Sequence, residues 1–119
     1  MTTSTTVYNR GDVVLVNFIF TDETGVKKRP AIIISSREYN NNRQEAIISA
    51  ITSRTERILT GDYLIKDWKK AGLISPSLAT CIIRTIKQDM ISKKLGKVTA
   101  NDLKQIDKHL KIALGIQRN

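Results

Sequence analysis

The sequence holds few of the residues that form disulfides, metal centres and aromatic binding surfaces. Of 119 residues, one is cysteine (Cys81), one is histidine (His109), and aromatic residues make up 5%. A single cysteine excludes an internal disulfide and is typical of a reducing cytoplasm. No cluster of cysteine and histidine has the spacing of metal ligands, so we expect neither a metal ion nor another cofactor.

Long apolar runs are also missing. No segment approaches the roughly 20 apolar residues that a membrane span requires. The threonine-rich start at Met1–Thr6 lacks the hydrophobic core of a secretory signal. We therefore expect a cytoplasmic protein with no attachment to a membrane.

Acidic residues are outnumbered by basic ones. The chain has 20 Lys and Arg against 11 Asp and Glu, which gives a formal net charge of +9. Such a balance favours a polyanionic partner such as nucleic acid, an acidic protein or an anionic surface, although a soluble protein can simply be basic. The length fits one domain over residues 1–119, with residues 1–8 as a flexible tail.

Short β-branched runs separated by turn residues predict a mainly β fold. Valine and isoleucine dominate the runs and favour strands, while glycine, asparagine, serine and proline punctuate the segments between them. We expect Lys87–Ser92 to add a short extension after the last predicted strand. The predicted strands are Val13–Phe20, Ala31–Ser35, Ala46–Thr52, Asp62–Ile65 and Leu78–Ile86.

The first two predicted strands flank the polar segment Thr21–Lys28 and are expected to pair antiparallel. Pro30 cannot donate a ladder hydrogen bond, so we expect it to be the first residue of its strand. Arg29 would then stand just outside the strand, at the rim of the sheet. Further on, Arg37–Glu45 contains three consecutive asparagines, which predict a turn.

The last part of the chain changes to helical periodicity. Thr99 is a predicted N-cap and Gly115 a predicted C-terminal glycine. The apolar residues between them fall on one helical face. Many short strands followed by one helix favour a small barrel. The predicted apolar face consists of Leu103, Ile106, Leu110, Ala113 and Leu114.

Six short motifs, in order along the chain, resemble the PemK/MazF toxin family of type II toxin–antitoxin systems. Each motif alone is weak, but the ordered set is fairly specific and runs from about residue 8 to the C-terminus. The motifs are Arg10-Gly11-Asp12-Val13-Val14, Gly25 to Ser35 with Arg29-Pro30, Ala50-Ile51-Thr52, Ser75-Pro76-Ser77, Arg84-Thr85-Ile86 and Ala113-Leu114-Gly115.

The resemblance implies a small SH3-like barrel with a C-terminal helix, assembled as a homodimer in a bacterial or archaeal cytoplasm. It implies a metal-independent, sequence-specific endoribonuclease that cuts single-stranded RNA, often mRNA. It also implies a cognate antitoxin that blocks the RNA groove. Cleavage without a metal can use the 2′-hydroxyl of RNA as the nucleophile, which leaves a 2′,3′-cyclic phosphate and a 5′-hydroxyl.

The resemblance also assigns catalytic residues. Arg29 matches the catalytic arginine of the family and Thr52 matches its active-site threonine. Glu23 is a candidate general base, displaced by about one position from the family carboxylate. Some relatives carry an arginine and a carboxylate where this chain has Ala79 and Cys81, so that pair is missing here. Without the resemblance, each residue has a simpler interpretation. Arg29 would be a solvated surface charge, Thr52 a hydroxyl bonded to local backbone, and Glu23 an exposed loop acid.

Basic residues are expected to gather in polar loops at one rim of the barrel and to track an RNA backbone. Stacking would fall to Trp68, Tyr39 or Tyr63, because aromatic residues are scarce. The predicted RNA-binding residues are Lys27, Lys28, Ser53, Arg54, Arg57, Trp68, Lys69 and Arg84.

Two other functions are compatible with the sequence. The same barrel also serves toxins that inhibit DNA gyrase without cutting RNA, and the absence of an acid–base pair at Ala79 and Cys81 is compatible with that activity. A non-catalytic RNA-binding barrel is the second alternative.

Overall fold

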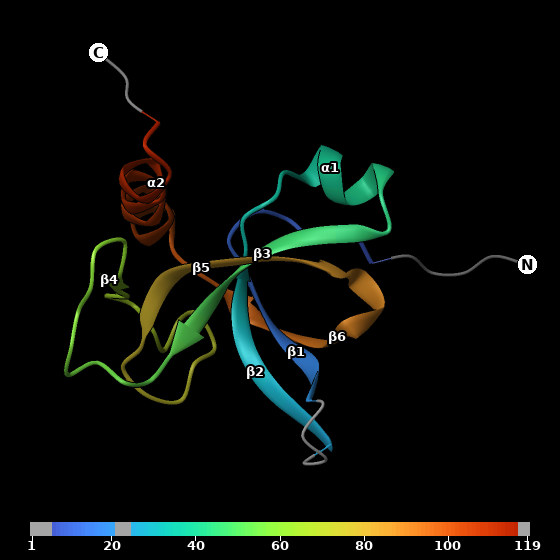
Figure 1. Ribbon diagram of the computed structural model, residues 1–119, viewed down its shortest axis with the longest axis horizontal. Helices are drawn as coiled ribbons and strands as arrows, with labels where there is room; N and C mark the ends of the chain where they lie inside the picture. Colours follow the sequence, from blue (N-terminus) through green and yellow to red (C-terminus); the bar gives the residue numbers. More distant parts are fainter. Residues whose placement is uncertain (1–5, 21–24, 117–119) are drawn as a thin grey trace, which may run out of the picture.

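The computed structural model describes residues 6–20 and 25–116. Six antiparallel strands form one sheet in the order β4-β5-β3-β2-β1-β6, and the sheet curls into a small barrel (Figure 1). The elements are β1 (Asp12–Phe20), β2 (Gly25–Ile33), α1 (Arg37–Asn42), β3 (Glu45–Thr52), β4 (Tyr63–Leu64), β5 (Leu78–Lys87), the 3-10 turn η1 (Gln88–Met90), β6 (Ile91–Lys97) and α2 (Ala100–Leu114).

β1, β3 and the second half of β2 are buried on both faces, which explains their apolar sequences. On one face, Val13 and Ile32 pack with Ile106 and Leu110 of α2. On the other face, Val14, Val16, Ala31 and Ile33 pack with Ala46, Ile48 and Ile86, and Met90 and Ile91 cover this second core. Alternate side chains of one strand point to opposite faces, so neighbours such as Val13 and Val14 belong to different cores.

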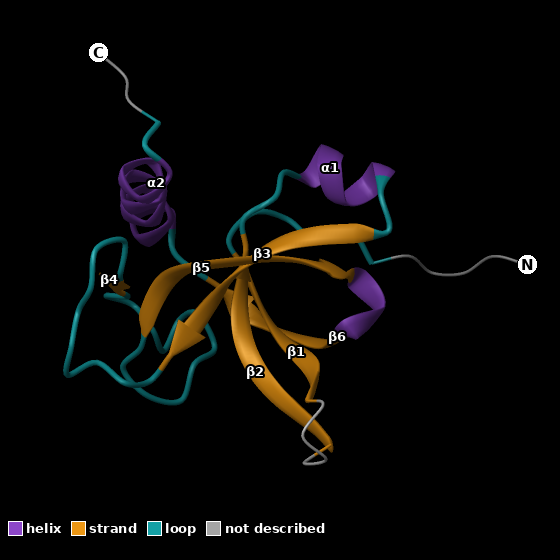
Figure 2. Cartoon of the chain, in the orientation of Figure 1, coloured by secondary structure: helices purple, strands orange, loops and turns teal. Residues whose placement is uncertain are grey.

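The two helices lie outside the sheet. α2 contacts β4 and β5, and α1 contacts β3, as the helices drawn in purple in Figure 2 show. Within the described residues, neither helix has the length and apolar character that crossing a membrane would take.

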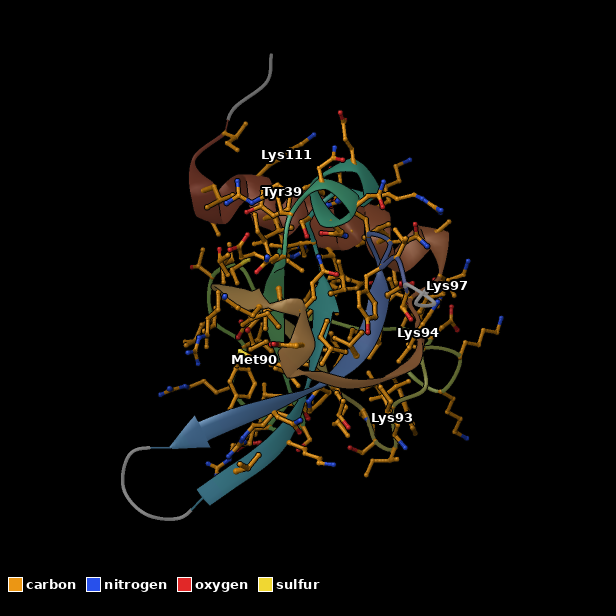
Figure 3. All side chains as sticks on the ribbon, turned by 90° about the vertical axis from the view of Figure 1, so that its right-hand side faces the viewer. Tyr39, Met90, Lys93, Lys94, Lys97 and Lys111 are labelled. Atoms are coloured by element: carbon orange, nitrogen blue, oxygen red, sulfur yellow. The ribbon has the colours of Figure 1, made fainter. Side chains whose placement is uncertain are left out.

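Lysines lie along β6, which is an edge strand of the sheet. Lys93, Lys94 and Lys97 are exposed and are labelled along this strand in Figure 3. The Nζ atom of Lys94 lies 3.1 Å from the carboxylate of Asp12, which is buried at the start of β1. This ion pair links β6 to β1 beside the backbone pairing of Asp12 with Lys97.

The ends of α2 follow the sequence signals. The hydroxyl of Thr99 accepts a hydrogen bond from the backbone N–H of Asp102 at 3.1 Å, and Gly115 adopts a left-handed φ of 73° at the C-cap. Ile106 and Leu110 are buried as predicted, whereas Ala113 and Leu114 are exposed. The apolar stripe therefore covers the core only as far as Leu110.

The carboxylate of Asp102 joins α2 to the segment after β4. It is fully buried and accepts hydrogen bonds from the Tyr63 hydroxyl at 2.5 Å and from the backbone N–H groups of Lys66 at 3.1 Å and Asp67 at 2.9 Å. Burial acts to raise the pKa of Asp102, but these hydrogen bonds outweigh burial and hold the pKa below its ordinary value of 3.8. The ionised form is therefore the form that stabilises the fold.

Replacing Asp102 with asparagine is expected to lower the free energy of unfolding at pH 7 by about 2 kcal/mol, since hydrogen bonds to a charged group are lost. Because the pKa is lowered on folding, the contribution of Asp102 is present above about pH 4 and disappears as the pH falls through the folded pKa. Urea unfolding from pH 7 down to pH 3 should show the two proteins converging in stability at acid pH. A constant difference over this range would contradict the assignment.

The structure corrects the predicted start of the second strand. β2 begins at Gly25, not at Pro30 or Ala31, because β1 pairs with it from Phe20↔Gly25 to Val13↔Ile32 and Pro30 lies within this ladder. Lys27, Lys28 and Arg29 therefore stand within a strand, not in a loop. The predicted antiparallel pairing of the first two strands is confirmed.

Two further elements differ from the prediction. Arg37–Asn42 forms a short helix, where Ser36 caps the N-terminus by accepting from the N–H of Tyr39 at 3.0 Å. Asn40 is buried there and its amide donates to the carbonyl of Tyr8 at 2.8 Å. The predicted extension at Lys87–Ser92 instead continues through η1 into β6, which ends at Lys97.

Candidate active site

The candidate site lies where β2 and β3 separate. These strands pair only at Ala31↔Ala50, Ile32↔Ser49 and Ile33↔Ile48. From Pro30 back to Gly25, β2 pairs with β1 alone. Past Ala50, β3 pairs with β5 as far as Thr52↔Leu78. The two strands diverge below this point (Figure 1), and a cleft of about 430 Å³ opens between them.

Arg29 and Thr52 both line this cleft. Extending the pairing of Ala31 with Ala50 by one step on the same face would set Arg29 opposite Thr52. Lys28 and Arg54 also line the cleft, and its described lining contains no aspartate or glutamate. The cleft is therefore strongly positive and suits a phosphate group.

The Thr52 hydroxyl is oriented by its own turn. Its oxygen accepts a hydrogen bond from the backbone N–H of Arg54 at 3.2 Å. A hydroxyl that accepts one bond still has its hydrogen to donate. The local backbone contact therefore leaves Thr52 able to donate to a bound phosphate oxygen.

The far wall of the cleft comes from the segment before β5. Leu73, Ile74, Ser75 and Ser77 line it, and the hydroxyl of Ser77 donates to the carbonyl of Ser75 at 2.9 Å. The sequence predicts a turn here but does not indicate that this turn faces Arg29.

A second hollow of about 680 Å³ adjoins the cleft and shares Ala50, Thr52 and Arg54 with it. Its other lining residues come from the loop after β3 and from β5. They are Glu56, Arg57, Leu59, Thr60, Asp62, Leu78, Thr80, Cys81 and Ile82.

Neither Ala79 nor Cys81 supplies an acid or a base that could act at neutral pH. Ala79 is buried in the core between the sheet and α2. The thiol of Cys81 lies 3.3 Å from the carbonyl oxygen of Gly61, and burial, together with the charge of Asp62, raises its pKa. The thiol therefore stays protonated at neutral pH.

Several predicted site residues lie elsewhere. Neither Trp68 nor Lys69 lines either hollow. Trp68 packs partly against the core, with the Lys69 ammonium 5.5 Å from its ring centre. The guanidinium of Arg84 stacks over Phe18 at 5.0 Å. Glu23 lies outside the described residues, and Lys27 is an exposed residue of β2.

The other aromatic candidates for stacking have partners in the protein. The Tyr39 ring lies under the Arg43 guanidinium at 5.0 Å. Burial and the hydrogen bond to Asp102 raise the pKa of Tyr63. The structure thus brings together Lys28, Arg29, Thr52, Ser53, Arg54 and, in the adjoining hollow, Arg57.

A sequence model of PemK-like, MazF-like toxins of type II toxin–antitoxin systems matches residues 9–114 of the chain. The chain belongs to this toxin family. The family predicted from the six motifs is thereby confirmed, since the match covers them from Arg10 to Leu114, all but the final Gly115.

Solved structures of similar fold agree with the architecture of the toxin. The MazE–MazF complex (Form-II) from Deinococcus radiodurans superposes with a TM-score of 0.80 at 19% identity, covering 95% of this chain and 100% of that chain. An endoribonuclease in complex with its cognate antitoxin from Mycobacterial species gives 0.75 at 20% identity, covering 94% and 99%. The Mycobacterium tuberculosis toxin MazF-mt6 gives 0.71 at 18% identity, covering 88% and 99%. The predicted mainly β barrel with a C-terminal helix is confirmed.

Proposed function

We propose that the toxin is a metal-independent endoribonuclease that cuts single-stranded RNA, including mRNA, at a short sequence. The observation that carries this proposal is the positive cleft between β2 and β3, which Arg29 and Thr52 line together. The endoribonuclease of similar fold from Mycobacterial species supports it.

The reaction is a transesterification within the RNA. The base removes the 2′ proton, the 2′-oxygen attacks the adjacent phosphorus, and the bond to the 5′-oxygen breaks. The departing oxygen takes a proton from Arg29, which regains one from solvent. Arg29 stabilises the negative charge on the phosphorane and donates to the leaving oxygen, while Thr52 donates to a non-bridging oxygen. Glu23 stays our candidate for the base that removes the 2′ proton.

The remaining residues of the cleft bind the RNA backbone. Lys28, Ser53 and Arg54 line the cleft beside Arg29 and Thr52, and Arg57 lines the adjoining hollow. The charges of Lys28, Arg54 and Arg57 act on successive phosphates, so affinity falls as the salt concentration rises.

The toxin acts in the cytoplasm as a homodimer, and an acidic antitoxin neutralises it. The MazE–MazF complexes of similar fold support a protein antitoxin as partner. The net charge of +9 favours rapid association with an acidic chain.

The decisive experiment incubates the purified toxin with a long single-stranded RNA in excess EDTA and maps the new ends. We expect discrete cuts with 5′-hydroxyl and 2′,3′-cyclic phosphate ends. An RNA with a 2′-O-methyl group at the cut nucleotide should resist. Cutting that requires Mg²⁺, or 5′-phosphate ends, would contradict the proposed chemistry. Intact RNA together with stalled DNA gyrase would favour the gyrase inhibitor instead.

Replacing Thr52 with valine is expected to slow cleavage by about 10- to 100-fold. The substitution keeps the side-chain shape but removes a hydrogen bond to a charged oxygen, worth about 1.5–3 kcal/mol. Thr52→Ser keeps the hydroxyl and should retain most of the activity. Single-turnover rates on one RNA give the comparison, and an equally slow Thr52→Ser variant would contradict a hydroxyl donor role.

A further inference from the structure

The two hollows beside Thr52 differ in charge. The cleft between β2 and β3 is lined by Lys28, Arg29 and Arg54, with no acidic residue among its described lining. In the adjoining hollow, Arg54 and Arg57 are balanced by Glu56 and Asp62. A phosphate is attracted to the first, whereas the balanced second hollow favours an uncharged group.

The adjoining hollow also offers apolar surface to a ligand. Leu59 and Ile82 are 55% and 63% exposed, and the half-buried Ala50 contributes further aliphatic lining. A volume of about 680 Å³ lies in the range of small-molecule sites, which combine apolar walls with a few polar groups. The flat faces of a nucleobase would cover these aliphatic side chains and remove them from water.

The carboxylates of Glu56 and Asp62 are the charged acceptors of this hollow, whereas Arg54 and Arg57, which we propose to hold phosphates, are its charged donors. One carboxylate oxygen of Asp62 accepts a hydrogen bond from the backbone N–H of Leu59 at 2.9 Å. This bond fixes the carboxylate and leaves its other oxygen able to accept a hydrogen bond from a ligand. Glu56 is exposed. Carboxylates accept hydrogen bonds from the amino groups of cytosine, adenine and guanine. At the position of the cytosine amino group, uracil carries an oxygen, which a carboxylate repels.

The two hollows are neighbours at the residues that line both. Ala50, Thr52 and Arg54 form a common wall. A nucleotide whose phosphate lies by Arg29 and Thr52 therefore has its base, or that of its neighbour, within reach of Glu56 and Asp62.

We propose that this hollow is a nucleobase pocket that selects a base with an amino group next to the cut and rejects uracil. The proposal rests on the proposed RNA cleavage and adds the feature of RNA that the toxin reads. Glu56 and Asp62 determine the selection, and Leu59 and Ile82 hold the base.

The test maps cleavage sites on a long RNA in which every pair of bases occurs many times. With the wild-type toxin, we expect uracil to be depleted about tenfold at one position flanking the cut, in line with 1–3 kcal/mol per specific base contact. The double variant Glu56→Gln/Asp62→Asn presents amides, which also donate to a uracil oxygen. Its depletion of uracil should fall below about threefold at that position, with selection at other positions unchanged.

The matched control is Glu38→Gln, which removes an exposed carboxylate on α1 and should leave the site preference as in the wild type. Wild-type selection against uracil that survives in the double variant would overturn the pocket while leaving the nuclease intact. So would wild-type cutting without any such selection.

A second measurement separates the pocket from the nuclease. Oligomers of deoxyadenosine, deoxycytidine and deoxyuridine lack the 2′-hydroxyl and are not cut by this chemistry. The wild-type toxin should bind the first two about tenfold more tightly than the third, and the double variant should bind all three alike. Equal wild-type affinities would overturn the base pocket, whereas intact RNA in the cleavage assay would overturn the proposed function.

Discussion

Replacing Arg29 with alanine is expected to lower the rate of RNA cleavage by about 100- to 1000-fold, the usual cost of removing one donor that stabilises charge in a transition state. Arg29 is an exposed residue held by a paired strand, with Val16 as its partner on β1. Truncation at Cβ should therefore leave the fold unchanged. Single-turnover cleavage of one RNA, with the melting temperature measured alongside, gives the result.

Two further variants sharpen this prediction. Arg29→Lys keeps the charge but not the forked guanidinium, so it should recover only a small part of the lost rate. Arg37→Ala removes an exposed arginine from α1, on an element that does not line the cleft, and should cut within about threefold of the wild type. An Arg29→Ala protein that cuts at the wild-type rate would remove Arg29 from the mechanism.

Replacing Gly72 with alanine is expected to destabilise the protein by about 3–5 kcal/mol, at the upper end of single substitutions. Gly72 has a left-handed φ of 87°, and a Cβ atom there would lie 2.2 Å from the carbonyl oxygen of Leu95 on β6. The obstacle is backbone, which cannot rotate away as a side chain can. Gly96 faces the same contact from the other side, because its own Cβ would lie 2.6 Å from the carbonyl oxygen of Ala71.

Gly115→Ala is the matched control for this substitution. Gly115 also has a left-handed φ, 73°, but nothing lies within 4 Å of the position of its Cβ. The control therefore carries only the backbone strain, about 1–2 kcal/mol. Thermal unfolding should place Gly72→Ala well below Gly115→Ala, by about 10 °C. Equal melting temperatures would mean that β6 and the turn at Gly72 separate at little cost.

The core elements could be predicted because their signals are local. Val13–Phe20 and Ala46–Thr52 are apolar enough to be recognised as buried strands, and Thr99 and Gly115 mark the ends of α2. The first part of β2 could not be recognised in this way. Gly25–Arg29 is polar and exposed, and it is a strand only because β1 extends far enough to pair with it.

The site could be predicted only in part. The family resemblance singles out Arg29 and Thr52, but the cleft that joins them depends on where β2 and β3 stop pairing, which is a property of the whole sheet. Glu56 and Asp62 lie in a loop whose sequence gives no sign that it folds back beside Thr52. Conversely, Trp68 in a lysine-rich turn suggested a contact with RNA, but the turn places its ring partly in the core.

The separation of β2 from β3 has a second consequence, for solubility. From Gly25 to Pro30, β2 has an open edge on the side facing β3, and such an edge can recruit a strand from another chain. The sequence at this edge is Lys27-Lys28-Arg29-Pro30, and charged residues and proline are what natural sheets use to prevent strand addition. The cations that we propose for holding RNA thus also prevent strand addition at this edge, and variants that neutralise several of them together should aggregate more readily than the wild type.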